Sequence, residues 1–180
     1  SGHYRQPLDV TRDKLAESKA QLDRLYGALR KVKGLEAPEA APPEKLVTAL
    51  ADDLNTPQAL AELHELAGAL NRAADPAGQA QLKGALLAGA ALLGLLEQDP
   101  EDWFKGRLYR KSLDATARGV AGVDARQEID EAEIERLIAA RNAARKAKNF
   151  AKADRIRDDL KAKGILLEDG PGGTTWKREG

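Results

Sequence analysis

The spacing of hydrophobic residues predicts a first half built from amphipathic helices. Over residues 12–33 apolar side chains recur every three or four positions, which is the period of an α-helix. Thr11 or Asp9 is a candidate N-cap for this helix, because short oxygen-bearing side chains accept from the free N–H groups of a first turn. The apolar positions of the stripe are Leu15, Leu22, Leu25, Tyr26, Leu29 and Val32.

Three further helical segments precede residue 98, after a Pro-rich loop over residues 34–43. A short helix is predicted over residues 44–51, and a longer one after Pro57, with Thr56 as its N-cap. Residues 80–98 are the most apolar segment, and their leucines cover more than one face, so we expect this helix to be innermost. These pieces predict an antiparallel helix bundle over residues 1–98.

The pattern then changes. Residues 99–127 contain Gly, Asp and charged residues without sustained periodicity, which predicts a linker. Residues 128–180 contain two further helical segments, the second closed by Gly164 as C-cap, and then two β-type runs joined by "GPGG". The predicted fold class is therefore mainly α: a helix bundle, a linker, and a small α/β module of two helices plus a β-hairpin.

Composition excludes several classes of site. The chain has 180 residues, no cysteine, and two histidines, His3 and His64, so it lacks the ligands for a disulfide or a Cys/His zinc site. No apolar run approaches the roughly 18 residues of a membrane span, so we expect a cytoplasmic protein with no membrane partner. There is also no methionine, and residues 1–11 do not have the features of the start of a protein, so we expect a piece cut from a longer protein.

The zero net charge hides a basic segment near the end of the chain. Residues 136–163 contain ten basic and three acidic residues, a balance of +7. A patch of this kind is what contact with a phosphate backbone requires. The alternative is a solvated helix face with no partner.

Several side chains near this segment are candidates for reading unpaired bases. Phe150 lies between the two predicted helices, where an aromatic ring can be displayed for stacking. Asp154 and Arg157 share one helical face, and Asp169 precedes the hairpin turn. Each has a structural alternative: Phe150 and Trp176 as packed or anchoring rings, Asp154 and Arg157 as a surface pair, and Asp169 as an ordinary turn residue.

Four stretches carry a resemblance to a known family. They are "SGHYRQPLDVT" (1–11), "DDLNTPQAL" (52–60), "RNAARKAKNFAKADRIRDDLKAKGI" (141–165) and "LLEDGPGGTTWKRE" (166–179). Together they resemble the C-terminal, tRNA-binding half of bacterial cysteinyl-tRNA synthetases, which are class I enzymes. The last stretch is the most specific, since its Gly/Pro spacing with a Trp is hard to obtain by chance.

The resemblance implies a role in protein synthesis. Enzymes of this family join cysteine to its tRNA with ATP, in a catalytic domain that carries HIGH-like and KMSKS-like motifs and a zinc ion. None of these is present here, so we expect ATP and zinc only in an absent, covalently continuous catalytic domain. This chain alone is expected to be inactive, with no catalytic residue, no metal ligand and no cofactor, and to be a monomer with a DALR-like bundle.

The resemblance also implies which residues meet the tRNA. Five match positions that contact the anticodon: Arg145, Phe150, Asp154, Arg157 and Asp169. The family often has Trp where this chain has Phe150. The charge of the basic segment, rather than the resemblance, predicts that three more residues contact the phosphate backbone: Arg141, Lys146 and Lys148. Two other functions stay open, a free-standing RNA-binding protein with this architecture and a helical protein-interaction module.

Overall fold

The computed structural model describes residues 11–106, 129–170 and 173–178. The N-cap expected at Asp9 and most of the predicted linker lie outside these residues. The chain divides into two compact units, Ser1–Trp103 and Phe104–Gly180. We call them the N-terminal and C-terminal units and describe each by itself.

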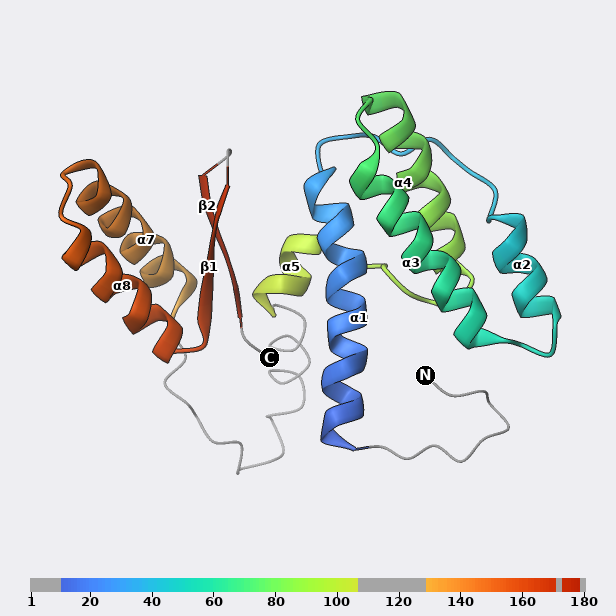
Figure 1. The fold of residues 1–180 in the computed structure, drawn as a ribbon, viewed down its shortest axis with the longest axis horizontal. Helices are drawn as coiled ribbons and strands as arrows, with labels where there is room; N and C mark the ends of the chain where they lie inside the picture. The colour runs from blue at the N-terminus through green and yellow to red at the C-terminus, as the bar shows by residue number, and fades with distance from the viewer. Residues whose placement is uncertain (1–10, 107–128, 171–172, 179–180) are drawn as a thin grey trace. The chain divides into compact units, whose positions relative to one another are not determined.

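The N-terminal unit is helical, as the spacing predicted. None of the described helices is long and apolar enough to cross a membrane. The bounds are α1 (Arg12–Lys31), α2 (Glu44–Ala51), α3 (Thr56–Arg72), α4 (Pro76–Ala91) and α5 (Pro100–Lys105), the last of which runs across the unit boundary (Figure 1).

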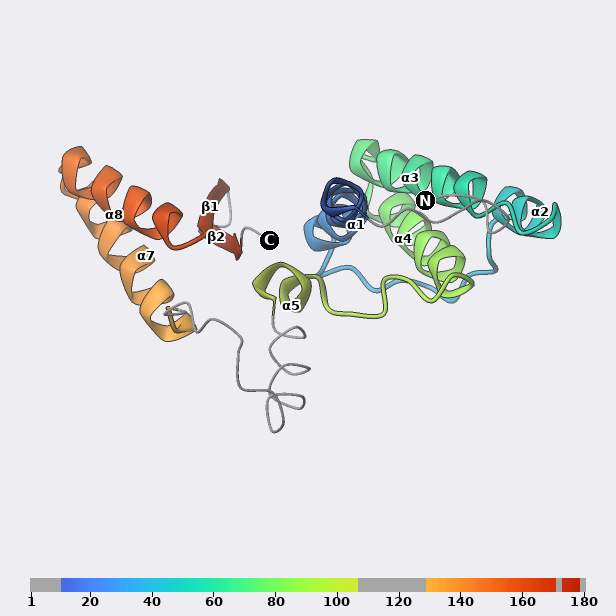
Figure 2. The ribbon, with the colours of Figure 1, turned by 90° about the horizontal axis from the view of Figure 1, so that it is seen from below.

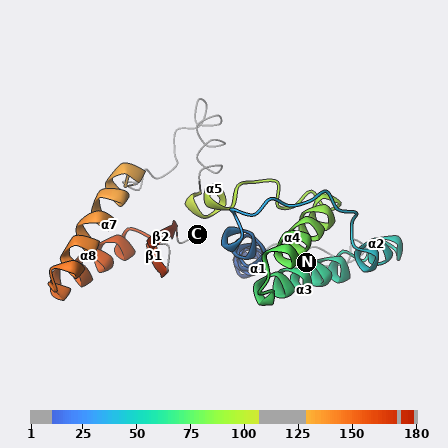
Figure 3. The ribbon, with the colours of Figure 1, turned by 90° about the horizontal axis from the view of Figure 1, so that it is seen from above.

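The central helix of this unit is α3. It packs against α1, α2 and α4, and it lies side by side with α4 in Figures 2 and 3. Leu63 and Leu70 of α3 are fully buried, and Ala59 and Ala67 are small enough to let the neighbouring helices approach closely. The expectation that residues 80–98 form the innermost helix was therefore wrong, and Leu92 is 50% exposed. The apolar content of residues 80–98 shows how hydrophobic the segment is, but it does not show how many other helices the segment contacts.

Helix ends confirm one predicted cap and correct three other details, namely the cap of α3 and both ends of α4. Thr11 caps α1, since its hydroxyl accepts from the Lys14 N–H at 3.3 Å, as expected. Asn55, and not Thr56, caps α3 by accepting from the Gln58 N–H at 3.2 Å. The helix predicted over residues 80–98 is α4. It begins earlier than predicted, at Pro76, because Asp75 caps it, and it also ends earlier, at Ala91.

The first part of the predicted linker is helical. Within it, Trp103 of α5 stacks on Tyr26 of α1 with ring centroids 4.5 Å apart. The indole N–H of Trp103 also donates to Asp23 at 2.7 Å, and Arg30 donates to Glu101 at 2.6 and 3.0 Å. An aromatic stack and two specific polar contacts thus hold α5 on α1.

The C-terminal unit has the predicted two helices and β-hairpin. Helix α7 (Glu131–Lys146) packs on α8 (Phe150–Ala162), and α8 leads through Gly164, at φ +73°, into the hairpin (Figure 1). A positive φ at this position suits glycine, which has no Cβ to clash. Strands β1 (Ile165–Gly170) and β2 (Gly173–Arg178) pair antiparallel, with Leu167 opposite Trp176.

The hairpin is held by a small apolar core under its inner face. Trp176 is 2% exposed, and its indole N–H donates to Glu135 of α7 at 2.8 Å. This confirms the prediction that Trp176 anchors the hairpin on the helices. The other buried members of the core are Ile129, Ile134, Ile138, Leu160 and Ile165.

Candidate nucleic-acid interface

The corner between α7 and α8 presents an aromatic ring and positive charge together. Phe150 is 61% exposed, so the alternative that it belongs to the core was wrong. Asn149 caps α8 by accepting from the Lys152 N–H at 3.1 Å, which places Phe150 at the first helical position. Lys146 and Lys148 are exposed beside it. The corner can therefore offer a flat apolar surface and cations to the same ligand.

The basic segment continues along α8 as an exposed surface. Lys152, Arg155, Lys161 and Lys163 are all exposed, while Ile156 and Leu160 of the same helix belong to the apolar core of the unit. Asp154 and Arg157 are exposed too, and they form an i,i+3 ion pair at 3.4 Å. Arg157 also lies 3.3 Å from Asp158. The predicted surface pair exists, and because exposed ion pairs are weak, both groups can leave it for a ligand.

The hairpin and the end of α7 form a polar group that we call the Asp169 cluster, consisting of Arg141, Asn142, Arg145, Asp169 and Thr174. The Asp169 carboxylate accepts from both Nη atoms of Arg141, at 3.0 and 2.8 Å. It also accepts from Arg145 at 2.9 Å and from the Thr174 hydroxyl at 2.7 Å. Asp169 is thus a member of β1 that ties the hairpin to α7, and not merely a turn residue.

The two arginines of the Asp169 cluster differ in environment. The side chain of Arg141 is 7% exposed, whereas that of Arg145 is 49% exposed. Arg141 was expected to contact phosphate. Its guanidinium is buried instead, and both of its Nη atoms donate to Asp169. Arg145 is on the surface, where it was expected to meet the anticodon.

These contacts set the ionisation of the cluster. Hydrogen bonds from Arg141 and then from Thr174 hold the pKa of the Asp169 carboxyl far below its usual range. The same pair raises the pKa of Arg141 above its already high value. The cluster therefore holds two positive charges and one negative charge across the range in which RNA binding is measured.

The low pKa of Asp169 predicts a pH dependence of stability. The folded pKa is below the unfolded one, so the contribution is fully present above about pH 3.9 and is lost as the pH falls through the folded pKa. We expect the stability advantage of the wild type over Asp169→Asn to be constant from about pH 7 to 5 and to shrink below about pH 4. Urea unfolding at stepped pH measures it. An advantage that already declines between pH 7 and 5 would contradict this assignment.

Sequence reasoning missed part of the Asp169 cluster. Thr174 and Asn142 were not singled out. The Thr174 hydroxyl lies 2.7 Å from Asp169 Oδ1 and 3.3 Å from Asn142 Oδ1, so it has two acceptors within reach. The available signal was the expected hairpin pairing, because Asp169 and Thr174 are opposite each other in the register. Nothing local in the sequence indicated that Arg141 would be buried.

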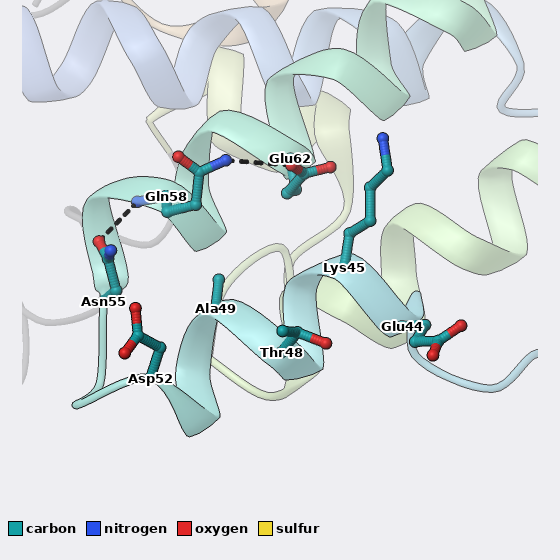
Figure 4. Close-up of a pocket in the computed structure, with 8 residues that line it drawn as sticks. All are labelled: Glu44, Lys45, Thr48, Ala49, Asp52, Asn55, Gln58 and Glu62. Atoms are coloured by element: carbon teal, nitrogen blue, oxygen red, sulfur yellow. Dashed lines mark hydrogen bonds between the residues drawn. The ribbon is translucent and has the colours of Figure 1, made fainter.

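The N-terminal unit has an open pocket between α2 and α3. Figure 4 shows its polar side chains, with Gln58 donating to Glu62 at 3.1 Å and Asn55 serving as the cap of α3. Within the described parts of the chain, no group of three acidic or histidine side chains is placed to hold a metal ion. We assign no chemistry to the pocket, whose lining is Glu44, Lys45, Thr48, Ala49, Asp52, Asn55, Gln58 and Glu62.

Comparison with known protein families places a domain in each unit. The model of the DALR domain matches residues 45–97, and that of the cysteinyl-tRNA ligase anticodon binding domain matches residues 131–176. The chain contains a DALR domain and a cysteinyl-tRNA ligase anticodon-binding domain. The second match covers α7, α8 and most of the hairpin, including the α7–α8 corner and the Asp169 cluster. The resemblance drawn from four stretches of sequence is thereby confirmed.

Curated relatives are similar to this chain over nearly its whole length. A cysteine–tRNA ligase of Paramagnetospirillum magneticum is 54% identical over 178 residues, and that of Parvibaculum lavamentivorans is 51% identical over 179. The enzyme of Rhodospirillum rubrum is 50% identical over 176 residues. Each comparison covers 98% of this chain and 35% of the relative, so the chain spans about a third of their length.

Proposed function

We propose that this chain binds the tRNA for cysteine and that its C-terminal unit reads the anticodon, as the tRNA-binding part of a cytoplasmic cysteine–tRNA ligase. The observation that carries the proposal is the match to an anticodon-binding domain over the unit that displays Phe150 and a basic surface. Activation of cysteine with ATP, and any zinc ion, belong in this proposal to another part of the enzyme. We propose that the chain acts as a monomer.

The chemistry of the exposed groups supports base reading at the anticodon, whose bases for cysteine are G, C and A. A guanine presents two adjacent N–H donors on its Watson–Crick edge, which a carboxylate such as Asp169 can accept as a pair. The amino group of cytosine needs an acceptor, and Asp154 is exposed and available for it. Arg157 and Arg145 can donate to base acceptors, and Phe150 can stack.

The role of the DALR domain in this proposal is positional. We propose that the bundle lies along the inner side of the L-shaped tRNA while the C-terminal unit holds the anticodon. Binding energy gathered far from the reaction is then used to orient the acceptor end at the active site. The chain thus contributes selectivity for the correct tRNA and carries out no chemistry itself.

A salt titration tests whether the C-terminal unit contacts phosphates. We expect log K for an anticodon stem-loop to fall with log[salt] at a slope of about −3 to −4, as four or five phosphate contacts require. Lys146→Gln should make the slope shallower by about one, because it removes one such contact. Lys45→Gln, an exposed change on α2, is the matched control and should leave the slope unchanged.

The outcomes of this titration separate the alternative functions. A flat salt response would exclude both RNA-binding functions and favour a helical protein-interaction module. A steep response with equal affinity for an anticodon-swapped stem-loop would leave only backbone contact, as a general RNA-binding protein would show. A steep response with preference for the cysteine anticodon supports the proposed function.

Phe150 is predicted to stack on an anticodon base. Phe150→Ala should weaken stem-loop binding by about 1–3 kcal/mol, the usual cost of losing one base–aromatic stack. The free energy of unfolding should change little, because the ring is 61% exposed in the free protein. Fluorescence anisotropy with a labelled stem-loop measures the affinity, and Phe150→Trp should retain it. Undiminished binding by Phe150→Ala would exclude stacking at this position.

A further inference from the structure

The carboxylate of Asp169 has no vacant acceptor site in the free protein. A carboxylate offers about four lone-pair directions. The described side chains direct four hydrogen bonds to it: Oδ1 accepts from Arg141 and Thr174, and Oδ2 accepts from Arg141 and Arg145. A base with two adjacent N–H donors gives one of them to each oxygen, so it can bind Asp169 as a pair only if one donor leaves Oδ1 and another leaves Oδ2.

Burial decides which donor can leave. The Arg141 side chain is 7% exposed, and its Nε has no hydrogen-bond partner within the described parts of the chain. Taking the carboxylate away from it would leave a buried guanidinium charge unpaired, which is strongly unfavourable. The Arg145 side chain is 49% exposed, so water or RNA can replace its one hydrogen bond to Oδ2. On Oδ1 the donor that can leave is the Thr174 hydroxyl, because it can turn to Asn142 Oδ1, which lies 3.3 Å away.

We propose that these two arginines divide their work on Asp169. Arg141 is a positioning residue that fixes the carboxylate through both of its Nη atoms. Arg145 is an exchangeable donor that the paired N–H groups of a guanine displace from Oδ2, while the Thr174 hydroxyl turns away from Oδ1. This inference rests on the proposed function, since it concerns how the same unit reads an anticodon base.

The exchange adds selectivity to the site. An incoming base must supply two N–H groups to compensate for the Arg145 and Thr174 hydrogen bonds that it removes. The Watson–Crick edges of adenine and cytosine each present an acceptor nitrogen to the carboxylate, so neither base can supply the pair. Once released, the Arg145 guanidinium stays beside the bound RNA, where it donates to an acceptor on the same molecule. Only the correct base converts an intramolecular ion pair into two intermolecular contacts.

A pair of matched substitutions tests this division in the whole 180-residue chain. Arg141→Lys and Arg145→Lys each keep the positive charge but replace a two-armed donor by a point charge. They lie on the same helix, one turn apart, and contact the same carboxylate. Each variant is titrated with two anticodon stem-loops, one with guanine and one with inosine, which keeps N1–H but lacks the second N–H group.

The wild type should prefer guanine over inosine by about tenfold, as expected for a paired contact. Arg141→Lys should reduce this ratio to about one or two, with an unchanged salt slope, because the carboxylate is no longer held in place. Arg145→Lys should keep the ratio at about tenfold. Equal ratios in the two variants would overturn the division of work while leaving RNA binding intact.

Two other results have distinct meanings. A wild type that binds both loops equally overturns this inference and leaves tRNA binding standing. A wild type that binds neither loop overturns the proposed function as well. Circular dichroism checks that each variant is folded, and if Arg141→Lys is not, the decision rests on the wild type alone.

In the wild type, nitrogen-15 spectra of the arginine side chains report which arginine changes its contacts when RNA binds. The guanine loop should shift the Nε–Hε signal of Arg145 and leave that of Arg141 in place, and the inosine loop should shift the Arg145 signal less. Movement of both signals together, or of neither, would overturn the proposal.

Discussion

Asp169→Ala should lower the free energy of unfolding of the C-terminal unit by about 2–3 kcal/mol. The cause is Arg141, whose buried guanidinium would lose both of its bonds to the carboxylate. Breaking a buried ion pair by removing one partner costs about 3–5 kcal/mol. We place this case lower because the Asp169 side chain is 43% exposed, so water can reach part of the site. Urea unfolding followed by Trp176 fluorescence, in a Trp103→Phe background, measures the loss.

Two controls separate the buried pair from the exposed one. Arg145→Ala breaks only the exposed contact to Asp169 and should cost about 0–1 kcal/mol. Asp169→Ala combined with Arg141→Met should recover most of the stability, since replacing both partners by apolar groups is often neutral. If Asp169→Ala changes stability by less than about 0.5 kcal/mol, the Arg141 pair is not holding the hairpin on α7.

This prediction affects how tRNA-binding data are interpreted. Asp169 is the obvious residue to mutate when testing anticodon reading, and loss of binding by Asp169→Ala is easily taken as proof of direct contact. Because the same carboxylate neutralises Arg141, such a loss can also come from a displaced or unfolded hairpin. Binding should be compared at a temperature at which both proteins are fully folded. Phe150→Ala tests the RNA-binding surface without disturbing the Arg141–Asp169 pair, because the ring is exposed.

Periodicity and turn chemistry were sufficient to predict most of the fold. The 44–51 helix was predicted with the observed bounds, since Pro42 and Pro43 precede it and "DDLN" ends its pattern. The hairpin followed from two β-type runs around a Gly/Pro turn. The central position of α3 could not be predicted, because it depends on which helices meet the small residues Ala59 and Ala67. α5 was missed because six residues are too few to show a period.

The candidate interface was predictable only where its signal is local. Phe150 and its flanking lysines are neighbours in sequence, so charge and position alone suggested a displayed ring. The Arg141–Asp169 pair joins residues 28 positions apart, and nothing near Arg141 distinguishes it from the exposed arginines around it. The face of α7 that turns inward is set by packing against α8 and the hairpin, which becomes visible only in the assembled unit.

Trp176→Ala should cost the C-terminal unit about 3–5 kcal/mol, the usual effect of deleting a buried large aromatic side chain. The ring is 2% exposed in a small core, and its N–H bond to Glu135 would be lost as well. A small unit has a total stability of only several kcal/mol, so this change should largely unfold it. Hydrogen exchange measured by mass spectrometry should show lost protection in α7 and α8, with α3 still protected.

The comparison with Phe150→Ala distinguishes an anchoring ring from a base-stacking ring. Both changes remove an aromatic side chain from the same unit, one buried and one 61% exposed. Trp176→Ala should abolish RNA binding by unfolding the unit, whereas Phe150→Ala should weaken binding with protection unchanged. If Trp176→Ala kept native protection in α7 and α8 and still lost RNA affinity, the indole would have to leave the core to meet the RNA. The hairpin would then be a moving part of the interface, in conflict with the Glu135 contact that fixes it on α7.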